Sequence, residues 1–456
     1  MQDLTKGSIA QNLVKMGSFM LVSMVFQTLY FLIDLYWVGR LGRSAVAALS
    51  LAGNLTFFVL AATQMLAVGT TSLIAQATGR QDRAEVRRVF NQSQVLSLVV
   101  GGLFFVVMMP LHRRYASGLA ADPETAAATS AYLGWFVPAL ALQFGMIAGA
   151  AALRGTGNFK PGMYIQSGSV ILNMLLAPVL IFGWGTGHPM GVAGAALASF
   201  IAVAAAVLAL LIYMVRHERY LELSAADARP RLQLWLRLIK IGLPAGAEFA
   251  MMAIYMVVVY AIIRPFGAAA QAGFGIGQRI VQSGFLPVVA LGFAVAPVAG
   301  QNFGARQSAR VRETFRLGAV MAMVMMAGFS LLCQIAAAPM IRVFSRDPRV
   351  LAVGVEYLRI VSFNFIPSGV VFVSSSMFQA LGNTLPALVS STVRMLVLTV
   401  PVLLLSRLAG FEMRWIWFIS VGAVLLQVTL NLLFLQRELR RKLAFAPAVT
   451  PAAAAG

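Results

Sequence analysis

Long apolar runs separated by short polar segments occupy nearly the whole chain. Twelve runs are long enough to cross a membrane, at about 13–38, 46–75, 91–111, 126–152, 162–184, 191–215, 238–263, 269–299, 316–338, 351–378, 385–408 and 414–435. A helix needs about 20 predominantly apolar residues to span a bilayer. The pattern therefore predicts an all-α polytopic membrane protein with about twelve transmembrane helices.

The second half of the chain repeats the first at an offset of 225 positions (304 − 79). The segment Gln76-Ala77-Thr78-Gly79 matches Gln301-Asn302-Phe303-Gly304, and Gly157-Asn158 matches Gly382-Asn383. The matches run in the same direction and fall in similar loops, which indicates parallel repeats about an axis normal to the membrane. A duplicated membrane half with sites at the repeat interface is a common plan for a secondary transporter.

The repeat predicts how the chain is divided. We expect an N-terminal lobe over residues 1–215 and a C-terminal lobe over 238–443, each with six helices. The polar segment 216–237 joins them and gives both lobes the same topology. The tail 444–456 is rich in Ala and Pro and is expected to be disordered.

Composition supports the membrane class and changes the meaning of the net charge. Charged residues make up 11% of the chain, against about a quarter in soluble domains, and the mean hydropathy is +0.83. A net charge of +20 would suggest nucleic acid in a soluble protein, but here the Lys and Arg residues lie in short loops. About 22 lie on the side of the termini and about 10 on the other. The positive-inside rule therefore predicts that both termini lie in the cytoplasm. We expect the protein to be a monomer in the plasma membrane, which is the inner membrane of a bacterium. Its expected partners are membrane lipids, and no nucleic-acid partner is expected.

Two further features limit the energy source and the redox chemistry. An ATP-binding phosphate loop needs a lysine directly after its last glycine, and none of the five lysines follows a glycine. An ion gradient is therefore expected to drive transport, with no ATPase subunit and no cofactor. Cys333 is the only cysteine, so no disulfide can form within the chain.

Only two of the fifteen acidic residues fall clearly inside apolar runs, Asp34 in the first half and Glu248 in the second. A charged side chain at membrane depth costs about 2.5–3.5 kcal/mol on insertion scales, so such residues mark functional sites. The i, i+3, i+7 spacing places Gln27 and Tyr30 on the helix face of Asp34, and Tyr255 shares the face of Glu248. These five residues are candidates for ion coupling (Asp34, Glu248) and substrate binding.

Each acidic residue also has a structural alternative. Asp34 could be an interfacial residue that extends to the outer headgroups. Glu248 could form an ion pair with a buried arginine, either Arg279 or Arg394, and so stabilise the packing of the helices. The remaining intramembrane polar residues Gln278, Gln282 and Asn364 are candidates for substrate binding, although hydrogen bonds between helices are the more usual role of such residues.

Several segments together resemble the multidrug and toxin extrusion (MATE) family. They are Ile33-Asp34, Val38-Gly39-Arg40-Leu41-Gly42, Leu153-Arg154-Gly155-Thr156-Gly157-Asn158, Gly191-Val192-Ala193-Gly194-Ala195-Ala196 and Ala380-Leu381-Gly382-Asn383-Thr384. The resemblance extends from about residue 10 to about residue 440. It implies two six-helix lobes around a central cleft, and antiport of small organic compounds against H⁺ or Na⁺.

The resemblance also implies an ion site in the first lobe. Family members carry an essential aspartate in the first helix, which matches Asp34, and many have an asparagine in the fifth helix, which matches Asn173. An aspartate expected one turn later is Ala177 here, and Ser199 takes the place of a hydroxyl in the sixth helix. Because Na⁺ prefers several hard oxygen ligands whereas a proton needs one carboxylate, this set favours H⁺ over Na⁺. Glu248 is one turn after Leu243-Pro244 rather than two, so it departs from the family's helix-7 glutamate.

Two other classes remain as alternatives. A lipid-linked precursor flippase of the same superfamily would need a cleft with a net basic lining, whereas an acidic and aromatic lining favours drug export. A membrane-embedded enzyme would need clustered His, Asp or Cys near one face. The few intramembrane ionisable groups argue against an enzyme.

Overall fold

The computed structural model describes residues 2–185, 187–224, 226–408 and 410–444. Within these ranges the chain forms helices and no strand, and twelve helical segments are long and apolar enough to cross a membrane, which confirms the predicted fold class. The first half contains α1 (Ile9–Gly39), α2 (Arg43–Gly79), α3 (Arg83–Leu119), α4 (Pro123–Gly155), α5 (Lys160–Phe182) and α6 (Gly191–His217). The second half contains α7 (Leu232–Ile263), α8 (Ala268–Gly304), α9 (Ser308–Arg342), α10 (Pro348–Val361), α11 (Phe365–Ala380), α12 (Leu385–Leu405) and α13 (Arg414–Lys442). Short 3₁₀ turns cover Arg219–Leu221, Arg264–Phe266 and Ser362–Asn364.

Several helices extend beyond the apolar runs that predicted them, and at α3 and α4 an aspartate caps the start of the helix. Asp82 starts α3 and accepts a hydrogen bond from the backbone N–H of Glu85 at 2.9 Å. Asp122 starts α4 and accepts from the backbone N–H of Thr125 at 2.8 Å. Hydrogen bonds from the backbone and hydroxyl of Thr125 hold the pKa of Asp122 below its usual range, so this carboxylate stays charged at the helix N-terminus.

One predicted helix is broken. The apolar run 351–378 corresponds to the span Pro348–Ala380, which is divided into α10 and α11 by the turn Ser362–Asn364. Side chains from α9 satisfy backbone groups at the break. Ser330 donates to the carbonyl of Ser362 at 2.9 Å, and Gln334 donates to the carbonyl of Arg359 at 2.7 Å. A run of apolar residues cannot reveal such a break, because it depends on these partners.

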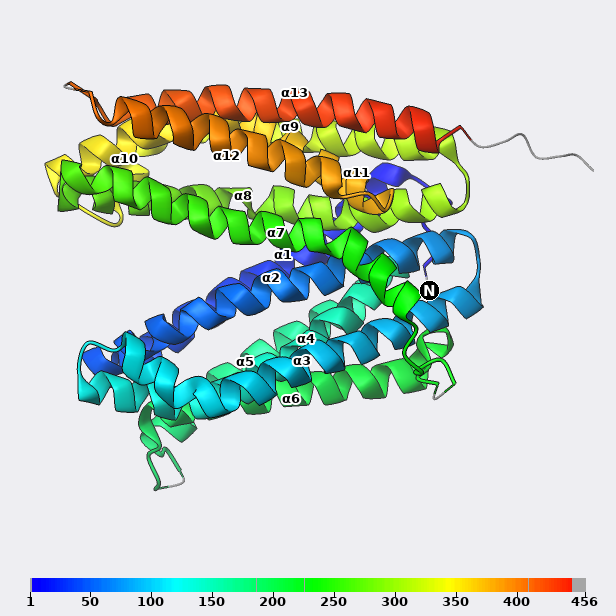
Figure 1. The fold of residues 1–456 in the computed structure, drawn as a ribbon, viewed down its shortest axis with the longest axis horizontal. Coiled ribbons are helices and arrows are strands. Elements are labelled where there is room, and N and C mark those ends of the chain that lie inside the picture. The colour runs from blue at the N-terminus through cyan, green and yellow to red at the C-terminus, as the bar shows by residue number, and fades with distance from the viewer. Residues whose placement is uncertain (1, 186, 225, 409, 445–456) are drawn as a thin grey trace, which may run out of the picture.

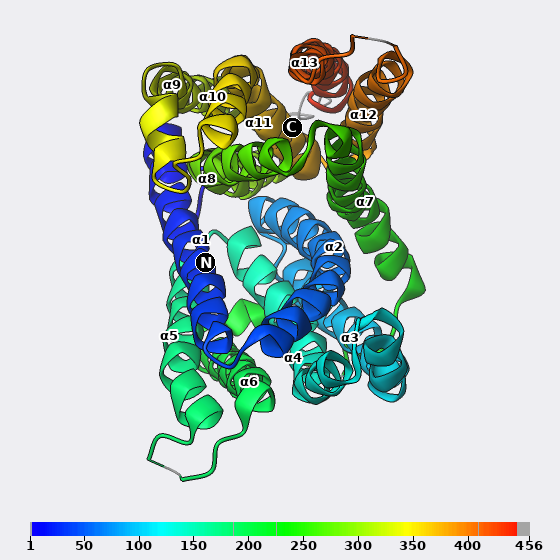
Figure 2. The ribbon, with the colours of Figure 1, turned by 90° about the vertical axis from the view of Figure 1, so that its left-hand side faces the viewer.

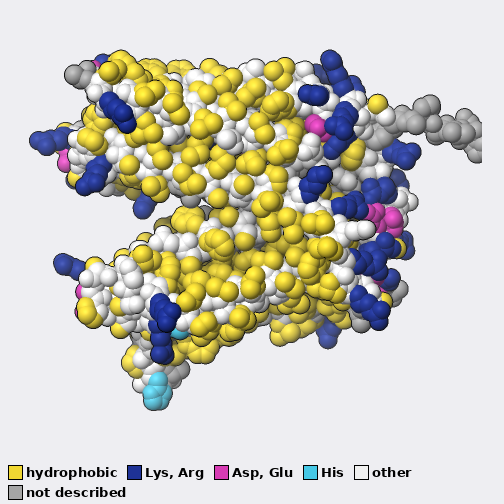
Figure 3. Space-filling model, viewed as in Figure 1, with side chains coloured by type: hydrophobic (Ala, Val, Ile, Leu, Met, Phe, Trp, Pro, Cys, Tyr) yellow, Lys and Arg dark blue, Asp and Glu magenta, His cyan; other side chains and the backbone are white. Residues whose placement is uncertain are grey.

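The helices form two bundles that meet on the side of the termini and separate on the opposite side (Figure 1). Each bundle has its own hydrophobic core, and most of the contacts between bundles are made by α1 with α8, by α2 with α7 and by α2 with α8. Figure 2 looks into the open side, where α2 and α8 face each other across the centre. The space-filling view shows the notch between the bundles and the Lys and Arg side chains gathered at the closed side (Figure 3). The lobe limits at 215 and 238 stay predictions, and most of the predicted tail (445–456) lies outside the described residues.

The internal repeat is visible in the backbone. Gln81 and Arg306 occupy equivalent positions and both have a positive φ, 59° and 58°, which is uncommon for residues other than glycine. The equivalent Gly157 and Gly382 have φ of 79° and 70°. The two halves therefore share their turn conformations, which supports a true structural duplication.

The asparagines of the repeated Gly-Asn segments have equivalent roles. Asn158 donates to a carboxylate oxygen of Glu218 at 2.7 Å, and Asn383 donates to Glu438 at 2.9 Å. In each lobe this bond ties the loop before the fifth span to the end of the sixth. The repeated motif thus stabilises the closed end of each bundle.

The connector between the halves is fixed to α3. The amide of Gln92 donates to the carbonyl of Asp227 at 2.6 Å and accepts from the backbone N–H of Arg231 at 2.9 Å. Arg87 forms an ion pair with the Asp227 carboxylate at 2.8 Å. The connector therefore belongs structurally to the closed side of the first bundle.

Candidate functional site

Residues from three helices of the first lobe meet at Tyr30, one helical turn before Asp34. Asp34 lies on α1 with 4% of its surface exposed, and Tyr30 lies one turn before it. The hydroxyls of Tyr30 and Ser199 (α6) lie 2.8 Å apart, and the amide nitrogen of Asn173 (α5) donates to Ser199 at 3.2 Å. The structure thus brings together Asp34, Tyr30, Asn173 and Ser199, which lie far apart in the sequence.

Two oxygens in this first-lobe cluster have no hydrogen-bond partner among the described residues. They are Oδ1 of Asp34 and Oδ1 of Asn173, and both are buried. Buried polar atoms are almost always hydrogen-bonded, so two unpartnered oxygens indicate a place for a proton, a cation or water. Tyr30 and Tyr132 lie within electrostatic range of the Asp34 carboxylate.

The burial of Asp34 does not fit the interfacial alternative. A carboxylate that extends to the outer headgroups would be exposed, whereas Asp34 is buried and Val38, one turn closer to the helix end, is fully buried. Ala177, also fully buried, lies one turn after Asn173 on α5. The cluster therefore contains one formal negative charge.

The second predicted carboxylate lies in the other lobe. Glu248 on α7 accepts a hydrogen bond from the hydroxyl of Ser391 (α12) at 2.8 Å. Among the described residues no ion pair within 4.0 Å joins Glu248 to Arg279 or Arg394, so the alternative of a direct arginine pair has no support, and the role of Glu248 stays a prediction. Neither Ser391 nor its further partner Gln427 (α13) was expected from the sequence. Their signal there is weak, a polar side chain within an otherwise apolar run.

The predicted substrate-binding residues are distributed over both lobes. Tyr255 lies on α7 near Glu248, while Gln27 and Gln282 are exposed. Gln278 accepts a hydrogen bond from the Tyr357 hydroxyl at 2.6 Å, and Asn364 donates to Ser420 at 2.9 Å. Gln278 and Asn364 therefore make the interhelical hydrogen bonds that were their alternative role, and a shared substrate site for all six stays a prediction.

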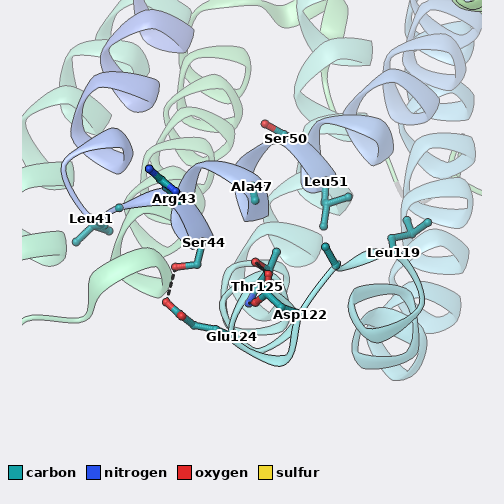
Figure 4. Close-up of a pocket in the computed structure, with 12 residues that line it drawn as sticks. Leu41, Arg43, Ser44, Ala47, Ser50, Leu51, Leu119, Asp122, Glu124 and Thr125 are labelled. Carbon is teal, nitrogen blue, oxygen red and sulfur yellow. Dashed lines mark hydrogen bonds between the residues drawn. The ribbon is translucent and has the colours of Figure 1, made fainter.

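A hollow of about 700 Å³ lies at the rim of the first lobe, on the side opposite the termini (Figure 4). It is lined by the start of α2 and the loop before α4, where Ser44 donates to Glu124 at 2.9 Å. None of the predicted site residues lines it. We therefore place the candidate site at the Asp34 cluster and not in this surface hollow.

The two lobes are in intimate contact on the side of the termini. A Cβ atom on Gly79 would overlap the carbonyl oxygen of Gln301, and a Cβ on Gly304 would overlap that of Gln76. Each glutamine also bonds to the opposite lobe: Gln76 donates to the carbonyl of Ala380 at 2.8 Å, and Gln301 to that of Gly155 at 3.0 Å. The repeated Gln-x-x-Gly motifs thus form a pseudo-symmetric seal.

The N-terminal segment adds to this seal. Leu4 is fully buried, its N–H donates to the side-chain oxygen of Gln301 at 3.0 Å, and its carbonyl accepts from Asn302 at 3.2 Å. The N–H of Gln2 donates to the carbonyl of Thr156 in the other lobe at 3.0 Å. Residues 2–7 therefore bridge both lobes where the seal forms.

The two equivalent helix crossings differ in tightness. A Cβ on Gly242 of α7 would overlap the carbonyl oxygen of Met65 on α2. At the equivalent Gly17 of α1, the nearest atom of α8 would be 3.8 Å away, the Cα of Leu291. The helix that carries Asp34 thus has the looser crossing.

Comparison with known proteins decides the family. The sequence model of the MatE family matches residues 20–179 and 244–405, which together make up well over half of the chain. The chain belongs to the MatE family. Both matched stretches begin within the first helix of a lobe, so the MatE match reproduces the internal repeat.

The relatives and solved structures agree with this MatE assignment. The chain is 28% identical over 384 residues to the multidrug export protein MepA of Staphylococcus haemolyticus (strain JCSC1435), covering 82% of this chain and 83% of MepA. It is 26% identical over 404 residues to the probable multidrug resistance protein YoeA of Bacillus subtilis (strain 168), covering 87% of each. Its fold matches the outward-facing conformation of a multidrug resistance MATE family transporter of the MOP superfamily, with a TM-score of 0.88, 22% identity, and coverage of 97% and 98%.

Proposed function

We propose that this MatE chain is a secondary active multidrug efflux antiporter that exports organic, often cationic and amphipathic compounds in exchange for H⁺. The observation that carries the proposal is the buried Asp34 carboxylate, whose Oδ1 has no partner among the described residues. The names of the relatives, multidrug export protein and probable multidrug resistance protein, support the substrate class.

The arrangement of the lobes supports alternating access. The seal around Gly79 and Gly304 blocks the side of the termini, while the notch between the lobes opens on the opposite side. In this arrangement a proton from the open side reaches Asp34 and removes its charge. The carboxylate then no longer attracts a cationic substrate, so proton and substrate compete for the same group.

The helix that carries Asp34 is suited to move. Because α1 crosses α8 less tightly than α7 crosses α2, a shift of α1 requires less repacking of backbone against backbone. Neutralising Asp34 lets this part of α1 pack more closely against α5 and α6, which narrows the first-lobe site and releases the substrate. The two conformations differ in the protonation of one residue, which couples the ion gradient to export.

The composition of the site favours H⁺ over Na⁺. Asp34 is the one acidic residue of the cluster, and Ala177 occupies the position of the second carboxylate that many family members have. A Na⁺ site made from Asp34, Asn173 and Ser199 would have a single formal charge. A proton needs only the carboxylate.

Charge distribution supports an orientation. The side of the termini holds most of the Lys and Arg residues (Figure 3), so we infer that it faces the cytoplasm of a plasma membrane. A reporter active only in the cytoplasm should then give signal when it is fused within 216–237 or after Arg441. Signal from fusions near Arg113 or Arg346 instead would reverse the orientation.

Lipid-linked precursor flipping is the alternative in the same superfamily. An anionic lipid substrate needs a net basic cleft, whereas the arginines at membrane depth, mainly Arg279 and Arg394, are opposed here by two carboxylates, Asp34 and Glu248. Export of organic compounds by a non-enzymatic transporter, with no ATPase subunit, therefore fits better.

The test of the proposed function is dye efflux by the Asp34→Asn variant. Asparagine keeps the size of the side chain and loses its titration, so efflux should be abolished while the protein remains folded and inserted. Asp122→Asn makes the same chemical change at a helix cap, where asparagine is equally suitable, and should leave efflux unchanged. Efflux at the wild-type rate by Asp34→Asn would refute the role of this carboxylate.

A further inference from the structure

A second polar cluster lies in the C-terminal lobe between α7 and α12. Glu248 and Tyr255 lie on the same face of α7 as the buried residues Ala245 and Val259, at helical spacing. Val259 lies in the core of the second lobe and Ala245 in the core of the first, so Glu248 and Tyr255 point toward protein and not toward lipid.

The matching face belongs to α12. Ser391 and Arg394 lie on the same face as Ala387, Leu398 and Val402, which are buried. Glu248, Tyr255 and Arg394 are themselves only half-buried, so this polar face remains accessible to a ligand.

A hydrogen-bond chain fixes the position of the Glu248 carboxylate. The Gln427 amide nitrogen donates to the hydroxyl of Ser391 at 3.1 Å, so that hydroxyl directs its own proton to Glu248, 2.8 Å away. Gln427 is 3% exposed and its side-chain oxygen has no partner in the described residues. Ser391 and Gln427 thus hold one oxygen of Glu248 and leave its other oxygen available.

Arg394 has the opposite charge but does not neutralise Glu248 by contact. Its guanidinium lies over the ring of Tyr255, 6.0 Å from the centroid. Among the described residues, the Arg394 side chain forms no hydrogen bond and no ion pair within 4.0 Å. Its charge interacts with that of Glu248 at longer range. A charged guanidinium without an acceptor is costly at membrane depth, and a ligand carboxylate would supply two acceptors to its planar fork.

We infer that Glu248, Tyr255 and Arg394 form a second substrate site, selective for zwitterionic aromatic compounds. The cationic group of the ligand binds Glu248, its carboxylate binds Arg394, and its aromatic body lies against Tyr255. The first-lobe cluster has Asp34 without a basic residue at hydrogen-bond distance, so it suits purely cationic compounds. This inference rests on the proposed export of organic compounds. It assigns cationic compounds to the first lobe and zwitterionic aromatic compounds to the second.

The test uses two ligands that differ in one group, rhodamine 6G, which is a cationic ethyl ester, and its free acid, which is a zwitterion. Binding to the purified full-length protein in lipid nanodiscs is measured by fluorescence polarisation. The wild-type protein should bind the free acid at least as tightly as the ester. Arg394→Gln should weaken binding of the free acid about tenfold or more and leave the ester unchanged, because a hydrogen bond between charged groups is lost.

Two further variants complete the test. Arg394→Lys keeps the charge and should retain part of the affinity for the free acid, whereas Arg279→Gln, at an exposed arginine on α8, should retain all of it. If the free acid binds Arg394→Gln as tightly as wild type, or binds wild type far more weakly than the ester, the inference is wrong.

Transport in vesicles separates this inference from the proposed function. If wild type exports both dyes and Arg394→Gln exports only the ester, the result supports both the proposed function and the second site. Export of the ester together with export of the free acid that does not depend on Arg394 overturns the second site alone. Absence of ion-driven export of either dye by wild type overturns the proposed function.

Discussion

Gly79 and Gln301 lie so close together that no Cβ atom fits between the glycine and the glutamine carbonyl oxygen. The repeat places Gly304 against Gln76 in the same way. The two lobes therefore pack backbone against backbone at equivalent glycines. This contact is the structural basis of the sealed side.

Gly79→Ala should prevent the seal from closing fully. Overpacking of a tight contact costs about 1–3 kcal/mol, so the ratio of closed to open molecules should fall about tenfold. Spin labels on the exposed, equivalent positions Ala84 and Ala309 should report a longer and broader distance between the lobes. The matched control Gly102→Ala adds the same methyl group where nothing lies within 4 Å, and it should leave the distance unchanged.

Leu4→Ala should weaken the same seal from the N-terminal segment. Leu4 is fully buried between residues of both lobes, and truncating a buried leucine costs about 2–5 kcal/mol. The spin-label distance between Ala84 and Ala309 should again increase. Leu119→Ala, at a half-exposed leucine on the opposite side, serves as control. An unchanged distance in Leu4→Ala would show that residues 2–7 rest on the lobes without holding them together.

Tyr30→Phe should impair export while leaving Asp34 in place. The variant loses the hydrogen bond to Ser199, worth about 1 kcal/mol, so the apparent substrate affinity should fall about fivefold. Export rates across a range of dye concentrations measure this change. Tyr164→Phe removes a hydroxyl from an exposed tyrosine of α5 and should have no effect. Equal dye affinities in the two variants would mean that the Tyr30 hydroxyl is not part of the site.

Ala177→Asp should change the ion specificity. The new carboxylate lies one turn after Asn173 and adds a charged oxygen ligand to the Asp34 cluster. Flux driven by a Na⁺ gradient should therefore increase relative to the unmodified protein. Ala177→Asn has nearly the same size without the charge and should not gain this dependence. A Na⁺-driven flux that is equally low in Ala177→Asp would show that position 177 does not contact the ion.

The sequence predicted the fold because apolar length and a repeat are local properties that are read along the chain. All twelve predicted runs correspond to spans, and the paired glycines at 157 and 382 adopt the same turn. The break at Ser362–Asn364 was missed because Ser330 and Gln334 of another helix stabilise it. Hydropathy carries no information about such partners.

The site was predictable in part, because a charged residue within an apolar run can also be recognised along the chain. Asp34 and Glu248 stand out because charge is rare in apolar runs, whereas Asn173 and Ser199 were identified from the family resemblance. Ser391 and Gln427 were missed, since a polar residue in a helix becomes part of a site only through packing against its neighbours. An arginine was the alternative partner considered for Glu248, but the hydrogen bond that the structure gives this carboxylate comes from the hydroxyl of Ser391.

Proton coupling through Asp34 is tested most directly by substrate flux in inverted vesicles that contain the unmodified protein. One gradient is imposed at a time, either pH with Na⁺ absent or Na⁺ with pH equal on both sides. A single carboxylate beside Asn173, Ser199 and Ala177 predicts robust flux under the pH gradient alone and little under the Na⁺ gradient alone. Robust flux under the Na⁺ gradient with pH clamped would contradict proton coupling and require additional oxygen ligands to complete a Na⁺ site.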